Sequence, residues 1–355
     1  MSRATRIQID LAALTHNIGV LKGALSNQKM MAVIKADAYG HGATAVAQHI
    51  APLVDACAVA FTEEAVALRE AGIECPILVM EGPHNESDVA LSAKLDFWIA
   101  LHDPLQIEWC KPHANTLPQV WLKADTGMHR LGFTPESLQT AASALTDMGV
   151  NRLVLMSHLA SAEYPQDPLT QSQIGLWQRL VKAWQGETSL CNSAATRNAL
   201  FAHCDWVRVG YALYGGQSAD MHPLSELKPA MHFSTAVIAL RRIARGETVG
   251  YGGRWRAERD SAIATLPVGY GDGYPWSAPD GTPVCIGGQI APIAGRVSMD
   301  MMTVDVTDCQ GIGVGTPATL WGDSPTIDEV ARHSGTIGYE LMARMTSRPP
   351  RGILR

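Results

Sequence analysis

A lysine closes a short apolar segment near the start of the chain, at a point where a strand should end. Lys35 follows the β-branched residues Val33 and Ile34, and a tyrosine and two glycines come within the next seven positions. A desolvated ammonium group is costly, so a lysine at a buried strand end is expected to have a chemical role. An amine whose pKa is depressed is the nucleophile that forms Schiff bases. Lys35 is therefore a candidate Schiff-base lysine, although a surface lysine would suit this segment if it stood alone.

Polar residues also end several later apolar runs. They are Lys123 with the following segment 125–132, the pair Ser157 and His158, the segment 192–194, and Arg208 before Gly210 and Tyr211. The carboxyl ends of the strands in a barrel of alternating strands and helices meet at one mouth, where such enzymes place their chemistry. Several polar strand ends at one mouth predict a site, because apolar residues would be less costly there.

The elements that position these residues form a regular series over the first 225 residues. Eight short apolar runs alternate with segments of helical periodicity, and a first helix begins after Asp10, a good N-cap residue. The predicted strands are 30–35, 57–60, 77–80, 96–100, 120–124, 153–157, 189–191 and 206–209, and predicted helices include 62–71, 135–145 and 169–184. This pattern favours an α/β fold, a (β/α)8 TIM barrel. A doubly wound open sheet is the competing fold, but the first turn has no G-x-G-x-x-G.

The second part of the chain has a different pattern. Residues 226–355 read as a mostly antiparallel C-terminal β domain after a barrel domain at 1–225, and the run 6–9 could add a strand to it. The predicted strands are 235–240, 262–266, 284–286, 290–293 and 303–306, with one helix at 326–333. Gly287 and Gly288 between two of these strands indicate a two-residue hairpin.

Composition limits the class of protein. The 355 residues are 46% apolar with a formal net charge of −6, which argues against a basic nucleic-acid groove. No uncharged apolar stretch of 18 residues occurs and the start has no apolar signal region, so we expect a cytoplasmic protein that does not bind membranes. The seven cysteines are widely spaced without a C-x-x-C pair, which favours reduced thiols. We predict no metal site.

Several segments resemble, in the same order, motifs of the alanine racemases. They are 32–42 (AVIKADAYGHG), 123–132 (KADTGMHRLG), 206–215 (WVRVGYALYG), 249–253 (VGYGG), 269–275 (GYGDGYP) and 295–301 (GRVSMDM). The match runs from residue 5 to about residue 348. The resemblance implies a pyridoxal 5'-phosphate barrel followed by a β domain, working as a head-to-tail homodimer with active sites at the subunit interface. It also implies interconversion of L-alanine and D-alanine, either for peptidoglycan or for alanine breakdown.

The resemblance assigns the proton transfers to two residues. Lys35 would hold the cofactor and act as the base for one enantiomer, and Tyr251 of the other subunit would serve the opposite face. Holding a tyrosine as phenolate at pH 7 costs roughly 4 kcal/mol, so positive charge is needed nearby, and the family's answer matches His158 and Arg208. Arg208 would also face the pyridine nitrogen, and a guanidinium donates a hydrogen bond without giving up its proton.

The resemblance assigns further residues to the cofactor and the substrate. Arg130 would bond both the cofactor's phenolic oxygen and the substrate carboxylate, and Lys123, which matches a lysine carbamylated in many members, would orient Arg130. Tyr270 is a supporting residue. The phosphate would be bound by hydroxyls of Tyr39, Ser193 and Tyr339 and by backbone N–H groups of Gly210 and Tyr211, and the second subunit would contact the substrate through Met299 and Asp300.

Three positions depart from the family's pattern. Trp276 stands where many members have a basic residue, and Leu159 and Glu163 replace Phe and Asp. All three would fall in the substrate entry corridor, so a broader specificity that includes serine is one alternative. A decarboxylase on the same architecture is another, although Tyr251 beside 299–300 favours a racemase. A non-catalytic pyridoxal-phosphate carrier would lack the C-terminal β region.

Overall fold

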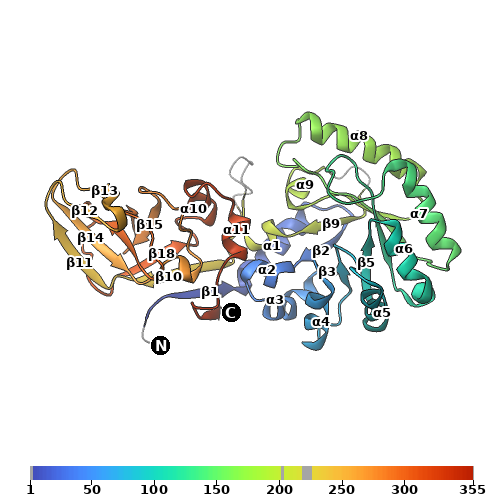
Figure 1. Ribbon diagram of the computed structural model, residues 1–355, viewed down its shortest axis with the longest axis horizontal. Helices are drawn as coiled ribbons and strands as arrows, with labels where there is room; N and C mark the ends of the chain where they lie inside the picture. Colours follow the sequence, from blue (N-terminus) through green and yellow to red (C-terminus); the bar gives the residue numbers. More distant parts are fainter. Residues whose placement is uncertain (1–2, 201–203, 218–225, 355) are drawn as a thin grey trace. The chain divides into compact units, whose positions relative to one another are not determined.

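The computed structural model describes residues 3–200, 204–217 and 226–354, which divide into two compact units (Figure 1). The first, here called the barrel unit, comprises the described residues within 15–213 together with Glu226. The second, the C-terminal unit, comprises the described residues within 3–14, 214–217 and 227–354.

The barrel unit contains a sheet of eight strands, all paired in parallel. They are β2 (Lys29–Val33), β3 (Ala56–Val59), β4 (Ile77–Val79), β5 (Phe97–Leu101), β6 (Val120–Lys123), β7 (Leu153–Met156), β8 (Glu187–Ser189) and β9 (Trp206–Val209). Strand β9 pairs with β2, and its far side meets β8 through backbone hydrogen bonds from Asp205 N to Thr188 O (2.9 Å) and from Arg208 N to Cys191 O (2.8 Å). These bonds bring the two ends of the sheet together in a nearly closed barrel. The predicted (β/α)8 fold is confirmed, with strand bounds shifted by one or two residues.

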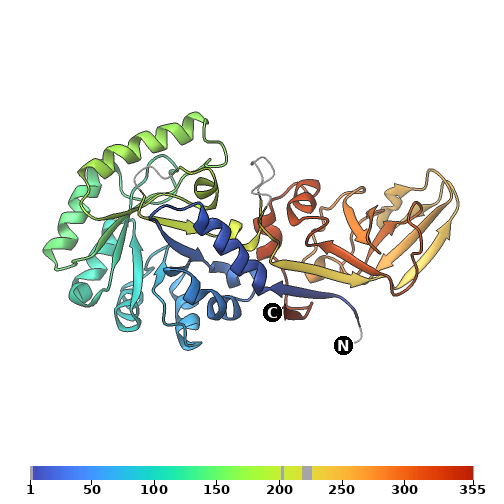
Figure 2. The same cartoon turned by 180° about the vertical axis from the view of Figure 1, so that it is seen from behind.

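Helices follow the barrel strands, and α4 to α8 lie on the outside of the sheet (Figures 1 and 2). Helix α1 begins as predicted, because Asp10 Oδ1 accepts a hydrogen bond from Ala13 N at 2.9 Å. The helices are α1 (Leu11–Gly23), α2 (Lys35–Gly40), α3 (Ala43–Ile50), α4 (Thr62–Glu70), α5 (Glu86–Leu95), α6 (Pro104–Cys110), α7 (Pro135–Asp147), α8 (Pro168–Ala183) and α9 (Ser193–Arg197), with 3-10 turns at Ala51–Leu53, Lys111–Thr116 and Tyr211–Tyr214.

Large aromatic side chains fill part of the barrel interior. The rings of Trp98, Trp121 and Trp206 lie 5.6 to 6.0 Å apart, in one stacked and two edge-on pairs. They belong to a buried cluster that includes Met31 and Val33 of β2. Aromatic pairs in these arrangements contribute about 0.5–1.5 kcal/mol each beyond the area they bury. The interior is therefore a packed core that holds the end of β2 in place.

The C-terminal unit is built on antiparallel sheets, apart from the parallel pair β1 and β19. Its six-stranded sheet has the order β16-β15-β18-β10-β1-β19, a three-stranded sheet has the order β11-β14-β17, and β12 pairs with β13. The strands are β1 (Arg6–Asp10), β10 (Met231–Ala236), β11 (Ala239–Ile243), β12 (Thr248–Val249), β13 (Trp255–Arg256), β14 (Ser261–Leu266), β15 (Pro283–Ile286), β16 (Gln289–Pro292), β17 (Met302–Asp305), β18 (Pro317–Trp321) and β19 (Arg351–Leu354). The helices are α10 (Ile327–His333) and α11 (Gly338–Ala343), with 3-10 turns at Tyr251–Gly253 and Tyr270–Asp272.

One predicted strand of this unit was wrong. The range 235–240 was expected to be a single strand, but the chain leaves β10 after Ala236 and enters β11 at Ala239. The intervening Val237 N donates to Thr316 O and Ile238 N to Thr265 O, both at 2.9 Å, so the chain changes from one sheet to the other there. The predicted hairpin is confirmed, since Gly287 and Gly288 both have positive φ, 57° and 80°, between β15 and β16.

Among the described residues, every helix is too short or too polar to cross a membrane. All seven cysteines are unpaired thiols, including Cys57 and Cys75, whose sulfurs lie 3.6 Å apart.

Candidate active site

Lys35 lies immediately beyond β2, at the carboxyl end of the barrel. Its side chain is half-buried. Because β2 pairs in parallel with β9, the segments that follow these two strands, beginning at Lys35 and at Gly210, leave the same end of the sheet side by side. The packed interior and the parallel register thus place the candidate lysine at the mouth predicted from the sequence.

The chain after Lys35 turns in a left-handed sense. The residues of the segment 36–39 all have φ between 52° and 54°, although none of them is glycine. A left-handed turn of L-residues costs about 1–2 kcal/mol per residue, so this segment stores several kcal/mol of strain. Such strain persists only where surrounding contacts hold it, and it concentrates at functional sites.

Hydrogen bonds within the segment offset part of that cost. Ala38 N donates to Ile34 O at 2.9 Å, and Gly42 N donates to Asp37 O at 2.9 Å. The Asp37 carboxylate accepts a further bond from Ala43 N at 2.7 Å. The turn therefore connects the lysine to the first residues of α3 in a fixed conformation.

The turn carries Tyr39 to the backbone that follows β9. A Cβ atom added to Gly210 would lie 2.5 Å from Tyr39 Oη, so only glycine permits this approach. Ser193 Oγ accepts hydrogen bonds from Gly210 N at 2.9 Å and from Ala212 N at 3.3 Å. Burial raises the pKa of Tyr39 to about 12, so its hydroxyl keeps its proton and remains a donor. Two hydroxyls and two backbone N–H groups, which Ser193 Oγ engages in this structure, thus gather here. Groups of these types suit a phosphate.

Four of the five predicted phosphate residues lie in this part of the barrel unit. Tyr211 is buried in the 3-10 turn directly after Gly210. Ala212 was missed by the sequence reasoning, because a backbone donor leaves no signal in the residue type. Tyr339, the fifth, lies in α11 of the C-terminal unit.

Lys123, Arg208 and Arg130 lie close enough to Lys35 for their charges to interact. Burial lowers the pKa of Lys123 to about 8, and the positive charges of Arg208, Arg130 and Lys35 lower it further, against a raising influence of Glu81. The Lys123 side chain is 7% exposed. Lowering the pKa makes the neutral amine accessible near neutral pH. Lys123 therefore has the character of a reactive amine in a cationic setting.

Arg208 is fixed by four acceptors. Its Nη1 donates to Ser189 O at 3.1 Å and to Ser189 Oγ at 2.5 Å, and its Nη2 donates to Ser157 O at 2.6 Å and to His158 Nδ1 at 3.3 Å. Its Nε–H donates to no acceptor among the described residues. The guanidinium is thus locked by both Nη groups, with one donor left for a ligand.

The expectation that His158 supplies positive charge is wrong. Burial lowers the pKa of His158 to about 3, and the charges of Arg208, Lys123, Arg130 and Lys35 lower it further. Since a guanidinium only donates, Nδ1 must accept the bond from Arg208, which leaves the ring proton on Nε2. His158 is therefore neutral at physiological pH, and the positive charge comes from Arg208 and its neighbours.

Arg130 lies on an exposed loop after β6. Asp125 orders this loop, because its Oδ1 accepts hydrogen bonds from Gly127 N at 2.9 Å and His129 N at 3.1 Å. These bonds, with the pairing of His129 Nδ1 and Asp125 Oδ2 at 3.0 Å, hold the pKa of Asp125 below its usual range despite partial burial. These bonds order the loop that carries Arg130, whose charge acts on Lys123 and His158.

The remaining predicted residues lie in the C-terminal unit. Tyr251, in the 3-10 turn after β12, is 73% exposed and lines an open cavity of about 390 Å³ with Thr265, Arg296 and Ser298. The short turn thus leaves most of the Tyr251 side chain in solvent. The sequence alone showed the glycines around it but not this exposure.

Met299 and Asp300 lie on an exposed loop beside the Tyr270 turn. Tyr270 N donates to Ser298 O and Gly271 N donates to Met299 O, both at 3.0 Å. Arg348 Nη2 donates to Asp300 Oδ1 at 2.9 Å. Tyr251, Tyr270, Met299, Asp300 and Tyr339 thus share one unit, and the other nine site residues share the barrel unit.

The residues that depart from the family pattern differ in their exposure. Trp276 is 54% exposed, stacks against the Arg296 guanidinium at 4.9 Å, and lines a cavity of about 560 Å³ with Tyr270. Glu163 is half-buried, whereas Leu159 is buried. Arg296 thus places a cation beside Trp276.

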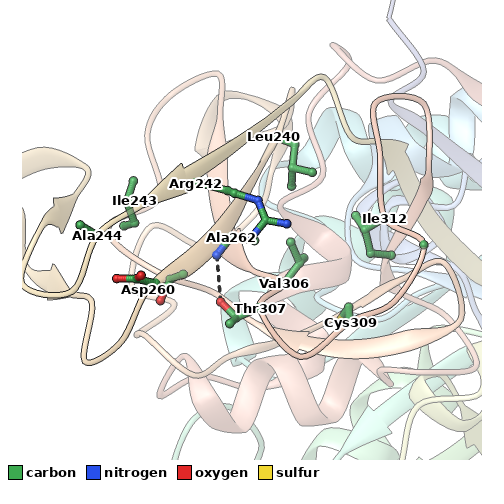
Figure 3. Close-up of a pocket in the computed structure, with 12 residues that line it drawn as sticks. Leu240, Arg242, Ile243, Ala244, Asp260, Ala262, Val306, Thr307, Cys309 and Ile312 are labelled. Atoms are coloured by element: carbon green, nitrogen blue, oxygen red, sulfur yellow. Dashed lines mark hydrogen bonds between the residues drawn. The ribbon is translucent and has the colours of Figure 1, made fainter.

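A further cavity of about 490 Å³ lies in the C-terminal unit, beside β11 and the start of β14 (Figure 3). Its lining includes Arg242, Asp260 and Thr307, whose Oγ1 accepts a hydrogen bond from Ala262 N at 2.9 Å. None of the residues predicted from the sequence lines this cavity, so it is separate from the candidate active site.

Comparisons with known proteins cover almost the whole chain. Residues 9–218 match the family model of the alanine racemase N-terminal domain, and residues 230–353 match that of the C-terminal domain. The chain is 43% identical to alanine racemase from Chromohalobacter salexigens, covering 99% of this chain and 98% of that protein. It is also 43% identical to the biosynthetic alanine racemase of Pseudomonas aeruginosa, with 97% of each chain covered.

Solved structures agree over the same length. The crystal structure of biosynthetic alanine racemase from Pseudomonas aeruginosa gives a TM-score of 0.94 at 42% identity, covering 99% of this chain and 100% of that one. Alanine racemase from Acinetobacter baumannii gives a TM-score of 0.94 at 35% identity, with the same coverage.

Proposed function

This chain belongs to the alanine racemase family and depends on pyridoxal 5'-phosphate to interconvert L-alanine and D-alanine, and we propose that Lys35 and Tyr251 share the two proton transfers. The observation that supports this assignment best is the grouping of Lys35 with a phosphate-type donor set and a locked guanidinium at one barrel mouth.

The residues of the barrel unit fit the cofactor. Tyr39 and Ser193, with the N–H groups of Gly210 and Ala212, suit its phosphate, and the narrow approach at Gly210 is a cradle that a Cβ would fill. We extend this set to Tyr211 and Tyr339 on the strength of the family match. When bound, the cofactor withdraws electrons from the substrate's α-carbon and so acidifies its α-proton.

Arg208 would meet the pyridine nitrogen through Nε–H, since both Nη groups already donate to protein acceptors. A guanidinium keeps its proton, so this contact polarises the ring without protonating it. We propose that the limited electron withdrawal favours simple return of the proton over side reactions such as transamination.

Arg130 and Lys123 would act on the substrate side of the mouth. The Arg130 guanidinium can bind a carboxylate in the paired geometry that arginine favours, and can also bond the cofactor's phenolic oxygen. We propose that Lys123 carries a carbamate. The modification would turn a buried cation among Arg130, Arg208 and Lys35 into an anion that orients Arg130.

Lys35 and Tyr251 would hold protons at opposite faces of the α-carbon. Lys35 Nζ takes the proton of one enantiomer, and Tyr251 Oη, from the partner subunit, takes that of the other. The exposure of Tyr251, Met299 and Asp300 supports a homodimer in which this surface completes the partner's site. The cations around Lys35 would lower the roughly 4 kcal/mol cost of the phenolate.

The two domains would supply different parts of the active site. We propose that residues 1–225 form the cofactor-binding domain, with the first nine serving the second domain, and that 226–355 supply the second base. The pairing of β1 with β10 and β19 supports the assignment of the first residues to the second domain.

The unpaired cysteines support a reducing, cytoplasmic location. The resemblance to a racemase named as biosynthetic supports a role in supplying D-alanine for peptidoglycan.

The alternatives receive less support. The full-length relatives reported above are named as racemases, which does not favour a decarboxylase or a cofactor carrier. Serine is the remaining alternative substrate, because Trp276 and Glu163 depart from the family pattern in the expected entry corridor.

Purified protein tests the function directly. We expect an imine absorbance band and loss of optical rotation from L-alanine without carbon dioxide release. A decarboxylase would release carbon dioxide, and a carrier would show the band alone. A panel with L-serine under the same conditions would show how strictly alanine is chosen.

A further inference from the structure

One carboxylate bridges two separate segments of the barrel mouth. Glu64 Oε1 accepts a hydrogen bond from Ala36 N at 2.6 Å. Its Oε2 accepts hydrogen bonds from Ala60 N at 2.8 Å and Phe61 N at 3.2 Å. Ala36 N is the first N–H of the left-handed turn and belongs to the peptide that links Lys35 to that turn.

Helix capping explains only half of this arrangement. Glu64 is the third residue of α4, and a glutamate there commonly reaches back to the backbone N–H before the helix. The bonds from Ala60 and Phe61 to Oε2 fit that role. The bond from Ala36 does not, since Ala36 lies 28 residues earlier and on another strand-to-helix connection.

Ala36 N donates to one oxygen of Glu64, and Ala60 N and Phe61 N donate to the other, so both oxygens must act as acceptors. A carboxylate provides acceptors on both sides, whereas the amide of a glutamine provides an oxygen on one side and donors on the other. Glutamine can still cap α4 through its oxygen. Its NH₂ group would then face the N–H of Ala36, donor against donor. The chain therefore uses the one side-chain type that satisfies both segments from this position.

We propose that Glu64 is a positioning residue for Lys35. By holding the peptide after Lys35, the carboxylate fixes the direction in which the lysine leaves β2. It also stabilises a turn whose backbone conformation is unfavourable for L-residues. A lysine that must attack one carbonyl and later reach one α-proton depends on such alignment, because small misplacements slow a reaction by large factors. This inference rests on the proposed role of Lys35.

The competing view is that Asp37 and the backbone bonds of the turn suffice. In that case Glu64 would only cap α4, and its loss would lower stability without a specific effect on Lys35. Glu64→Gln separates the two views, because it keeps the cap and removes the acceptor for Ala36. Glu63→Gln is the matched control, since the neighbouring Glu63 is exposed and its carboxylate accepts no hydrogen bond from any described residue.

The experiment compares wild type, Glu64→Gln and Glu63→Gln as complete chains. Apoenzyme is mixed with pyridoxal 5'-phosphate, and the rate of imine formation is followed by absorbance. Melting temperature, hydrogen exchange at the Ala36 amide, kcat and KM are measured on the same samples. For Glu64→Gln we expect imine formation and kcat to fall by roughly tenfold to a hundredfold, with faster exchange at Ala36. Its melting temperature should lie only about 2–4 °C below that of Glu63→Gln, since one hydrogen bond to an exposed amide is lost.

Two results would overturn the role of Glu64. Wild-type rates of imine formation and turnover in Glu64→Gln would overturn the proposal, as would a loss that follows melting temperature alone. Glu64→Ala, which loses the cap as well, should lose both stability and imine formation. If wild-type protein forms no imine, the assignment of Lys35 fails, and the role of Glu64 fails with it. If wild type forms the imine and Glu64→Gln behaves identically, only the role of Glu64 fails.

Discussion

Nδ1 of His158 accepts a hydrogen bond from Nη2 of Arg208 at 3.3 Å. Because arginine never accepts, this contact requires an unprotonated Nδ1 and so favours the neutral imidazole. The buried guanidinium of Arg208 is thereby held in part by a partner that adds no charge. Arg208 therefore carries the positive charge of this pair, and His158 is one of the four acceptors that orient its guanidinium.

The neutral state of His158 predicts a pH dependence of stability. The folded protein binds a proton at His158 only near pH 3, whereas an unfolded histidine does so near 6.5. Below pH 6.5 the unfolded state binds more protons, so the free energy of unfolding should fall with decreasing pH, by at most about 1.4 kcal/mol per pH unit down to pH 3. When the free energy of unfolding is measured by chemical denaturation between pH 5 and 7, it should depend less steeply on pH in His158→Gln than in wild type. Identical slopes would contradict a neutral His158.

Lys35→Ala should abolish the imine absorbance and racemisation together. The change removes the only amine proposed to bond covalently to the cofactor, while Tyr39, Ser193 and Arg208 remain to bind it non-covalently. Absorbance spectra and polarimetry provide the two readouts. A retained imine band would show that another lysine holds the cofactor; Lys29→Ala, at the opposite end of β2, is the control.

Gly210→Ala should weaken cofactor binding. The added methyl would meet Tyr39 Oη at 2.5 Å, and overpacking of this kind costs about 1–3 kcal/mol. We expect the dissociation constant of pyridoxal 5'-phosphate from apoenzyme to rise by roughly tenfold to a hundredfold. Gly175→Ala in α8, where the nearest atom lies 4.0 Å away, should bind the cofactor as wild type does. Equal affinities for both variants would argue against the phosphate cradle.

Lys123 should carry a carbamate in bicarbonate-containing buffer near pH 8. A pKa of about 8 leaves much of the amine neutral, which carbon dioxide requires, and the surrounding cations would stabilise the product. Carbon-13 NMR with labelled bicarbonate should show a carbamate resonance that Lys123→Arg lacks. Its absence from the wild-type spectrum would leave Lys123 as an amine.

Much of the barrel site followed from residue types at strand ends. Lys35, Lys123 and Arg208 each come at or near the end of a strand, and parallel pairing brings such ends together. The family motifs supplied the rest of the set. The charge on His158 could not be inferred this way, because it depends on burial and on cations contributed by other strands.

Other features depend on contacts that residue patterns do not show. The left-handed segment 36–39 contains no glycine, and the carboxylate that accepts its first N–H lies 28 residues further along the chain. The division of 235–240 between two sheets is similar, since the apolar pattern continues across Val237 while its hydrogen bonds change partner. β18, which begins at Pro317, was not predicted, because a proline at the start weakens the strand pattern.

The central claim is that a lysine and a partner-supplied tyrosine act from opposite faces of the substrate. The most direct measurement follows loss of the α-protium in deuterium oxide from L-alanine and, separately, from D-alanine, in wild type and in Tyr251→Phe. We predict that the variant keeps the imine band but loses exchange from L-alanine by roughly 10²- to 10⁴-fold, with D-alanine much less affected. Comparable slowing of both enantiomers would contradict the two-base account.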